Sequence, residues 1–414
     1  MPATLTADAL ADALRPGIEV YAPGCAGHSR LFEDWLQGAP ERSAGVRYSG
    51  IHIPTVNRFD FAGLHPQARM RGIFLGPDWR RAWEAGQFDY LPISYSAAWQ
   101  WLASEARFDL ALVQVAPPDA EGNCSLGLAC DFTPAAWPRA RRVLAHVNPA
   151  MPATGGPSIP WARIDAVVEA PAPLLEAPDP AADAALDAVA AQVAALVPDG
   201  ATLQLGLGRL QSAVLRQLDG RRDLRIHSGM VSDGLLGLLD SGALAGHPGA
   251  VTAGVALGTT ELYGRAAGRI AFREVGHTHD NGVLRAIPKL HAINSALSVD
   301  LLGQVNGDCL GGRLVSGLGG LPDFLRGARQ SPGGRGIVAL PASTPRGKPR
   351  IVPLLEDGPV SLPRIDADVV VTEHGAADLR YLDTHARAQA LIAIAAPEHR
   401  DELGRAWQAL AKRL

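Results

Sequence analysis

The chain has 414 residues, enough for two or three domains of ordinary size. A hydrophobic fraction of 47% against 19% charged residues allows a sizeable buried core. The formal net charge of −4 argues against the basic footprint of a nucleic-acid-binding protein. The four cysteines lie far apart except for Cys124 and Cys130, whose spacing fits no zinc pattern. This usage is typical of a reducing cytoplasm rather than of a disulfide framework, so we expect a cytoplasmic protein.

We also expect no secretory signal and no membrane partner. Residues 1–17 lack a basic region followed by an apolar stretch. No uninterrupted apolar run reaches the roughly 20 residues that cross a bilayer.

Short apolar runs alternate with helical stretches through the first half of the chain. Arg139, Arg141 and Arg142 are interpreted as a helix end or face. Strands interleaved with helices predict a parallel, buried sheet. The expected helices cover residues 30–37 and 94–107, and the expected strands cover 17–22, 46–53, 70–75, 88–92, 110–115, 143–147 and 166–169.

A Pro- and Ala-rich segment, residues 170–185, is interpreted as the domain boundary, giving domains over residues 1–180 and 186–414. The fold class predicted is α/β: two open α/β domains with the ligand in the cleft between them or at the carboxyl ends of strands. In the second half, helices are expected over 186–196, 211–218, 234–240, 387–394 and 399–414, and strands over 201–205, 225–227, 250–256, 290–294, 336–339 and 369–372.

Seven motifs follow one another in order, and together they resemble the acetyl-CoA hydrolase/4-hydroxybutyrate CoA-transferase family. The longest contains Ser316-Gly-Leu-Gly-Gly320, whose glycines let the backbone approach a ligand closely. A single motif would be weak, whereas seven in the right order are specific. They occupy residues 114–127, 147–152, 206–208, 227–234, 257–263, 303–324 and 371–379.

The resemblance implies two α/β domains and a coenzyme A thioester as the ligand. Members of the family move coenzyme A between carboxylic acids or hydrolyse an acyl-CoA, through a glutamate that becomes a glutamyl-CoA thioester. Gly319 or Gly320 would supply the amide that stabilises the oxyanion. The implied partners are an acyl-CoA, a small carboxylate for a transferase, and a second copy in a homodimer. The residues expected to contact coenzyme A are Gly206, Gly208, Arg209, Gln304, Asn306, Gly317, Gly319 and Gly320.

The chain departs from the family where the nucleophile is expected. The family motif reads His-Thr-Glu-Met-x-Ser-Asp-Gly, and the matching stretch here reads His227-Ser-Gly-Met-Val-Ser-Asp-Gly234. Gly229 therefore stands where the resemblance places the glutamate, and glycine has no side chain to carry an acyl group. Ser228 is the adjacent candidate, although neighbouring strand residues point to opposite faces.

A second departure supplies new acid–base groups at residues 273–281. Glu274 replaces a proline of the family pattern, and His279 stands where a catalytic-site asparagine is expected. We expect Glu274, His277, His279 and Asp280, together with His227, to provide acid–base chemistry near neutral pH. His277 and His279 alternate as metal ligands do, but no further ligand occurs at a characteristic spacing, so no metal is predicted.

Arg209 is a third departure, since the family has a small residue after the glycine motif. An arginine there could bind a carboxylate or phosphate, or lie solvated at a helix start.

Three functions stay open at this point. The first is a CoA-transferase or acyl-CoA hydrolase in which Glu274 replaces the missing carboxylate. The second is a non-covalent hydrolase or lyase that uses Glu274, His277 and His279. The third is a catalytically silent acyl-CoA binder, which a ligand would stabilise without turnover.

Overall fold

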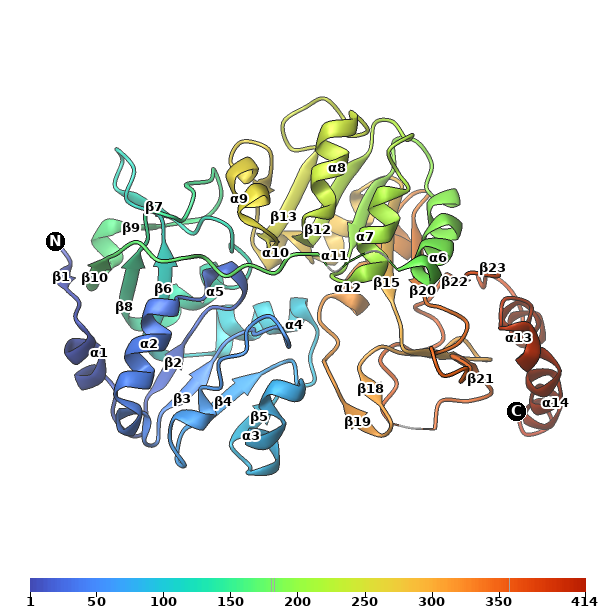
Figure 1. Cartoon of the computed structure of the whole chain (residues 1–414), viewed down its shortest axis with the longest axis horizontal. Coiled ribbons are helices and arrows are strands. Elements are labelled where there is room, and N and C mark those ends of the chain that lie inside the picture. The colour runs from blue at the N-terminus through green and yellow to red at the C-terminus, as the bar shows by residue number, and fades with distance from the viewer. Residues whose placement is uncertain (180, 182, 357) are drawn as a thin grey trace. The chain divides into compact units, whose positions relative to one another are not determined.

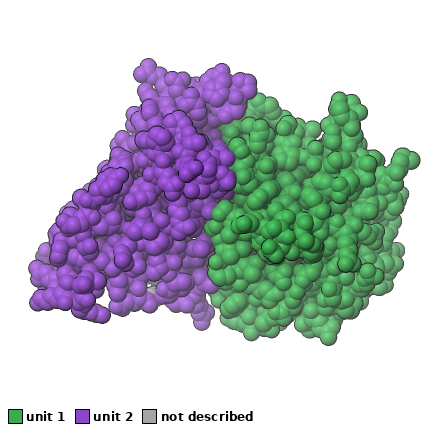
Figure 2. All heavy atoms as spheres, turned by 180° about the vertical axis from the view of Figure 1, so that it is seen from behind, with its two compact units in different colours: residues 1–178, 251–278 green, residues 179–250, 279–414 purple. Residues whose placement is uncertain are grey.

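The computed structural model describes residues 1–179, 181, 183–356 and 358–414 (Figure 1). The chain forms two compact units (Figure 2). Unit 1 comprises Met1–Pro178 and Val251–Thr278, and unit 2 comprises Asp179–Ala250 and His279–Leu414. The expected division differs from these units at Asp179, which belongs to unit 2, and in residues 251–278, which belong to unit 1. Residues 180 and 182 of the expected linker lie outside the described residues.

Unit 1 is built on an eight-stranded sheet in which every pairing is parallel (Figure 1). The central strand β6 is buried along almost its whole length, as expected for a parallel sheet covered on both faces. The strand order is β1 (Ala3–Thr4), β10 (Ala166–Glu169), β8 (Ala140–Val147), β6 (Phe108–Val115), β2 (Glu19–Tyr21), β3 (Arg47–Ser49), β4 (Arg69–Gly72) and β5 (Phe88–Tyr90).

Local signals explain where the helices of unit 1 begin. In α2, the Ser29 side chain accepts a hydrogen bond from the Phe32 amide, and Phe32 and Leu36 form the buried face. The expected helix over 94–107 is α4 followed by a π-helical turn over Trp101–Glu105. The α-helices are α1 (Ala7–Ala13), α2 (Arg30–Gly38), α3 (Arg80–Glu84), α4 (Tyr95–Gln100), α5 (Thr133–Ala136), α9 (Thr260–Ala266) and α10 (Val275–Thr278).

The interpretation of the arginines near residue 140 is wrong for two of the three. Arg139 ends a short 3-10 turn, but Arg141 and Arg142 lie in β8. The apolar run that follows them pairs with β6, and this pairing extends the strand back to Ala140. Because both arginines are at the exposed start of the strand, their charges stay in solvent, and Arg141 lies 3.5 Å from Asp109.

Four further strands belong to unit 1. β7 (Asn123–Ser125) pairs antiparallel with β9 (Ser158–Pro160), and β13 (Val251–Ala256) pairs parallel with β14 (Ala271–Phe272).

Unit 2 has its own largely parallel sheet, in which only β23 runs antiparallel to its neighbour among the pairings described. Leu290, Phe324, Leu325, Val338 and Val370 belong to the buried core around it. Within this unit the strand order is β12 (Arg225–Val231), β11 (Thr202–Leu205), β15 (Leu290–Ser295), β20 (Arg335–Ala339), β22 (Val369–Thr372) and β23 (Gly375–Asp378).

Helices and short strands surround this second sheet (Figure 1). The helices are α6 (Ala184–Ala195), α7 (Arg209–Arg216), α8 (Gly234–Ser241), α11 (Asn281–Ala286), α12 (Leu321–Gln330), α13 (Thr384–Ala393) and α14 (Arg400–Ala411). The short strands are β16 (Ser298–Asp300), β17 (Val305–Asn306), β18 (Cys309–Leu310), β19 (Arg313–Leu314) and β21 (Ile351–Val352). The predicted α/β class with parallel sheets is confirmed.

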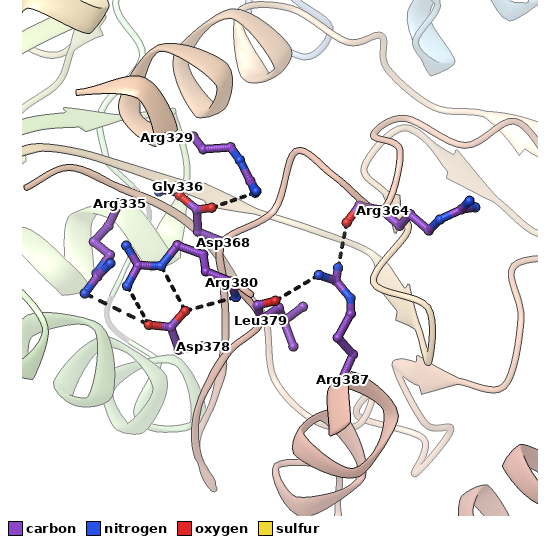
Figure 3. A network of polar contacts seen from close by, with 9 residues as sticks. All are labelled: Arg329, Arg335, Gly336, Arg364, Asp368, Asp378, Leu379, Arg380 and Arg387. Carbon is purple, nitrogen blue, oxygen red and sulfur yellow. Dashed lines mark hydrogen bonds and ion pairs between the residues drawn. The ribbon is translucent and has the colours of Figure 1, made fainter. Parts of the chain in front are cut away.

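The buried carboxylate of Asp368 links helices and strands of unit 2 (Figure 3). Asp368, which is fully buried, pairs with Arg329 of α12 at 2.8 Å and accepts a hydrogen bond from the Gly336 amide at 3.1 Å. Arg387 of α13 donates to the carbonyl oxygens of Leu379, at 2.9 Å, and Arg364, at 2.6 Å. These contacts tie α12, β20 and α13 to the segments around β22 and β23.

Candidate functional site

Strand β12 carries the segment in which the nucleophile is expected. It runs four residues beyond the expected strand and includes His227, Ser228 and Gly229. A Cβ atom built on Gly229 would lie 2.6 Å from Cε1 and 2.9 Å from Nε2 of His279. Real Cβ atoms essentially never approach other heavy atoms within 3.0 Å, so only glycine fits here while His279 keeps its position.

The Gly-rich loop meets the same imidazole. Gly319 has a φ of +55°, a left-handed conformation that glycine adopts without strain, and Gly320 directly precedes α12. A Cβ atom on Gly320 would lie 2.5 Å from Nε2 of His279. The structure thus brings Gly229, His279 and Gly320 together, although the first and last of them are 91 positions apart in the sequence (320 − 229).

His279 is buried and uncharged at neutral pH. Its side chain is packed on Phe324, with ring centroids 4.4 Å apart, and only 2% of the residue is exposed. Burial, and to a smaller extent the neighbouring His227, lower the pKa of His279 from 6.5 to about 3. A neutral imidazole can donate one hydrogen bond and accept another.

Ser228 points away from this arrangement. Its hydroxyl donates to the carbonyl oxygen of Leu205 on the neighbouring strand at 2.9 Å. It lines a cavity of about 20 Å³ with Gly206 and Met230, among others. That volume is room for about one water molecule and excludes an acyl chain. Its role as a nucleophile stays a prediction.

The other acid–base candidates have contacts of their own. Asp280 caps α11, since its carboxylate accepts from the Val283 amide at 2.9 Å, and it is exposed. Glu274 and His277 belong to unit 1, where the Glu274 carbonyl oxygen accepts from the His277 amide at 2.9 Å. The charge of Glu274 contributes to raising the pKa of the buried Cys130 thiol, after burial itself and Asp131.

Two of the residues expected to contact coenzyme A hold their own loop together. The Gln304 amide group donates to the carboxylate of Asp300 at 2.7 Å. The Asn306 side chain donates to the Cys309 carbonyl at 2.7 Å and accepts from the Cys309 amide at 2.9 Å. Gly317 lies half-buried in the loop before α12.

The glycine motif of β11 leads directly into α7. Gly206 follows the strand, and Gly208 has a φ of +129°, which glycine tolerates and other residues rarely adopt. Arg209, the first residue of α7, has 60% of its side chain exposed and lies 3.8 Å from Asp183. This geometry matches the solvated helix-start alternative, and binding of a ligand anion by Arg209 stays a prediction.

Unit 1 contains a buried polar cluster that the sequence interpretation did not include. Cys25, with a φ of +50°, lies in the turn between β2 and α2, and its amide donates to the Asn57 side chain at 2.9 Å. Burial raises the pKa of Asp131 to about 6 and keeps the Cys25 thiol protonated, with Asp131 adding to the rise at Cys25 and at Tyr95. The turn sequence Pro23-Gly-Cys-Ala-Gly27 is the one sequence signal that could have indicated it.

The described residues contain no group of three or more His, Cys, Asp or Glu side chains placed to hold a metal ion. In the same part of the chain, no helix has both the length and the apolar character needed to cross a membrane.

Comparison with known proteins identifies the class to which this fold and site belong. Residues 50–176 match the acetyl-CoA hydrolase/transferase N-terminal domain, and residues 258–407 match the acetyl-CoA hydrolase/transferase C-terminal domain. The chain is 37% identical over 366 residues to a 4-hydroxybutyrate coenzyme A transferase of Clostridium kluyveri, covering 85% of each protein. The chain therefore belongs to the acetyl-CoA hydrolase/transferase family.

Solved structures agree with this assignment over the full length. RipA from Yersinia pestis superposes with a TM-score of 0.91 at 30% identity, covering 99% of this chain and 98% of that one. A 4-hydroxybutyrate CoA-transferase from Porphyromonas gingivalis superposes with a TM-score of 0.81 at 29% identity, covering 100% and 98%. The relatives of the chain include CoA-transferases and acetyl-CoA hydrolases, which places it among CoA-thioester enzymes.

Proposed function

We propose that the protein acts on an acyl-CoA as a hydrolase or lyase, without a glutamyl-CoA intermediate at residue 229. One observation carries the proposal: the imidazole of His279 fills the space that a side chain at position 229 needs. Transfer of coenzyme A by the family's covalent route requires a carboxylate at that point. A site that holds a neutral ring there is suited to direct attack by water or to a change within the acyl group.

In this proposal, His279 acts as a neutral hydrogen-bond donor to the thioester carbonyl. A general base works best when its pKa is near the operating pH, and burial lowers the pKa of His279 to about 3. A neutral imidazole with a low pKa can still polarise a carbonyl, as known enzymes show. The amides of Gly319 and Gly320 would share this task, because backbone N–H groups stabilise developing negative charge on oxygen.

A chromatographic assay tests the proposal. Acetyl-CoA, butyryl-CoA and succinyl-CoA are each incubated with the protein, with and without acetate or succinate, and all CoA species are separated. We expect free CoA, or a changed acyl group on CoA, at a rate that does not depend on the added carboxylate. Exchange of CoA onto acetate or succinate would contradict the proposal, since the family's covalent route to this exchange requires a carboxylate of the protein that accepts CoA.

The weak basicity of His279 also favours a second candidate, an acyl-CoA binder without turnover. Such a protein would be stabilised by its ligand as the ligand concentration exceeds the dissociation constant. Thermal unfolding of the same samples separates the two functions: a higher melting temperature with unchanged acyl-CoA indicates binding alone.

A further inference from the structure

The imidazole of His279 lies in a slot whose walls come from three places in unit 2. Cε1 and Nε2 face Gly229, Nε2 and Cδ2 face Gly320, and the ring contacts Phe324. A Cβ atom on Gly229 would also lie 3.7 Å from the Phe324 ring, and one on Gly320 would lie 3.2 Å from it. We call Gly229, Gly320 and Phe324 the imidazole slot.

The ring has little freedom to leave this slot. The residue is 2% exposed, so another rotamer would have to displace buried neighbours. The next residue, Asp280, caps α11 through the Val283 amide at 2.9 Å, which anchors the backbone beside the histidine. The atoms closest to Gly229 belong to a rigid ring rather than to the end of a flexible chain.

We propose that His279 determines which type of reaction this site can carry out. Glycine at 229 and histidine at 279 form one steric unit, and together they close the site to a covalent intermediate. The inference rests on the proposed function for its ligand, an acyl-CoA, but its steric part concerns the protein alone. It implies that a glutamate at 229 becomes functional only after the ring at 279 is replaced by a shorter side chain. Asparagine is suitable because it lacks the ring atoms Cε1 and Nε2 that lie nearest Gly229.

The steric part is tested by a double-mutant cycle on thermal unfolding, which needs no ligand. Gly229→Ala alone should lower the melting temperature by roughly 5 °C, because a methyl group is forced against a fixed ring. In a His279→Asn background, the same change should lower it by much less. Equal losses in both backgrounds would overturn the inference.

A matched control comes from Gly237 in α8. A Cβ atom on Gly237 would meet nothing within 4 Å. Gly237→Ala should therefore leave the melting temperature unchanged or raise it slightly, equally in both backgrounds, since alanine favours a helix over glycine.

The chemical part is tested by intact-protein mass spectrometry after incubation with acetyl-CoA. A carboxylate introduced by Gly229→Glu would attack the thioester carbonyl, break the C–S bond and release CoA thiolate, leaving a mixed anhydride. The thiolate would then attack the protein-side carbonyl of the anhydride, release acetate and leave CoA bonded to the protein as a thioester. We expect this adduct in Gly229→Glu/His279→Asn and not in Gly229→Glu.

The outcomes separate the inference from the proposed function. An adduct on Gly229→Glu alone, or none on the double variant when it is shown to bind acetyl-CoA by ligand-induced stabilisation, would overturn the inference. If neither the native protein nor any variant binds an acyl-CoA, the proposed function fails. The double-mutant cycle then still shows whether residues 229 and 279 are sterically coupled.

Discussion

Two buried titratable side chains of unit 2 have opposite surroundings. Asp368 lies among donors: Arg329 at 2.8 Å and the Gly336 amide at 3.1 Å compensate its charge (Figure 3). His279 lies among glycine backbone and the Phe324 ring, beside another histidine. Burial shifts the pKa of each toward the neutral form, upward for Asp368 and downward for His279.

The difference teaches how to tell a structural polar group from a functional candidate. The Asp368 carboxylate links α12 and β20 to the start of β22. These contacts give the buried carboxylate a structural role in the fold. The His279 ring takes space from position 229 and from the Gly-rich loop, where the family resemblance places the chemistry. A buried titratable group with a shifted pKa is the better functional candidate when it also lies at a site of expected chemistry.

The largest effect on stability is expected for a substitution of Asp368. Asp368→Asn removes the carboxylate from a fully buried position and leaves the Arg329 guanidinium without its partner. We expect a loss of about 3 kcal/mol in the free energy of unfolding, at the lower end for buried pairs because 36% of the Arg329 side chain is exposed. Urea unfolding measures it.

Asp378→Asn is the matched control for this variant. The Asp378 carboxylate pairs with Arg380 at 2.7 Å but is 48% exposed. Surface pairs of this kind contribute about 0–1 kcal/mol, so the control should be nearly neutral. Equal losses for the two variants would mean that burial is not what distinguishes Asp368.

The next effect is a pH dependence from His279. Its pKa is about 3 in the folded protein against an ordinary 6.5. Between these values the unfolded chain binds a proton that the folded chain does not, so stability falls as the pH falls from 6.5 toward 3. One such proton contributes a slope of about 1.4 kcal/mol per pH unit.

His279→Asn should remove the contribution of His279 to the slope of the unfolding free energy against pH. Urea unfolding of both proteins at several pH values between about 4 and 6 measures the difference. At higher pH, where neither state takes up the proton, the two curves should run parallel. A variant with the full native slope would show that His279 is protonated in the folded protein.

The smallest effect concerns Asp280, which the sequence placed among the acid–base groups and the structure places at a helix start. Asp280→Ala removes the N-cap of α11 and should lower the stability by about 1 kcal/mol. Asp383→Ala removes the corresponding cap of α13, where the carboxylate accepts from the Ala386 amide at 2.9 Å. A loss of turnover in Asp280→Ala well beyond that of Asp383→Ala would return Asp280 to a catalytic role.

Much of the fold could be predicted from the sequence, because buried parallel strands are apolar runs with clear ends. β10 and β22 have the expected bounds, and most other expected strands and helices overlap observed ones. The arginines of β8 were misassigned because exposed charges at a strand start resemble those of a helix. The helix α12 was not predicted, since its pattern begins inside the glycine motif.

The candidate site, too, could be predicted from the sequence only in part. Order and spacing of motifs along the chain indicated the family and marked Gly229 and His279 as departures, because glycine and histidine differ in chemistry from the residues expected there. Only the tertiary structure decided that these two departures meet, since a strand and a distant loop are brought together by packing that local sequence does not encode. The same packing buries His279 and keeps its ring neutral, although the sequence suggested this histidine as an acid or base.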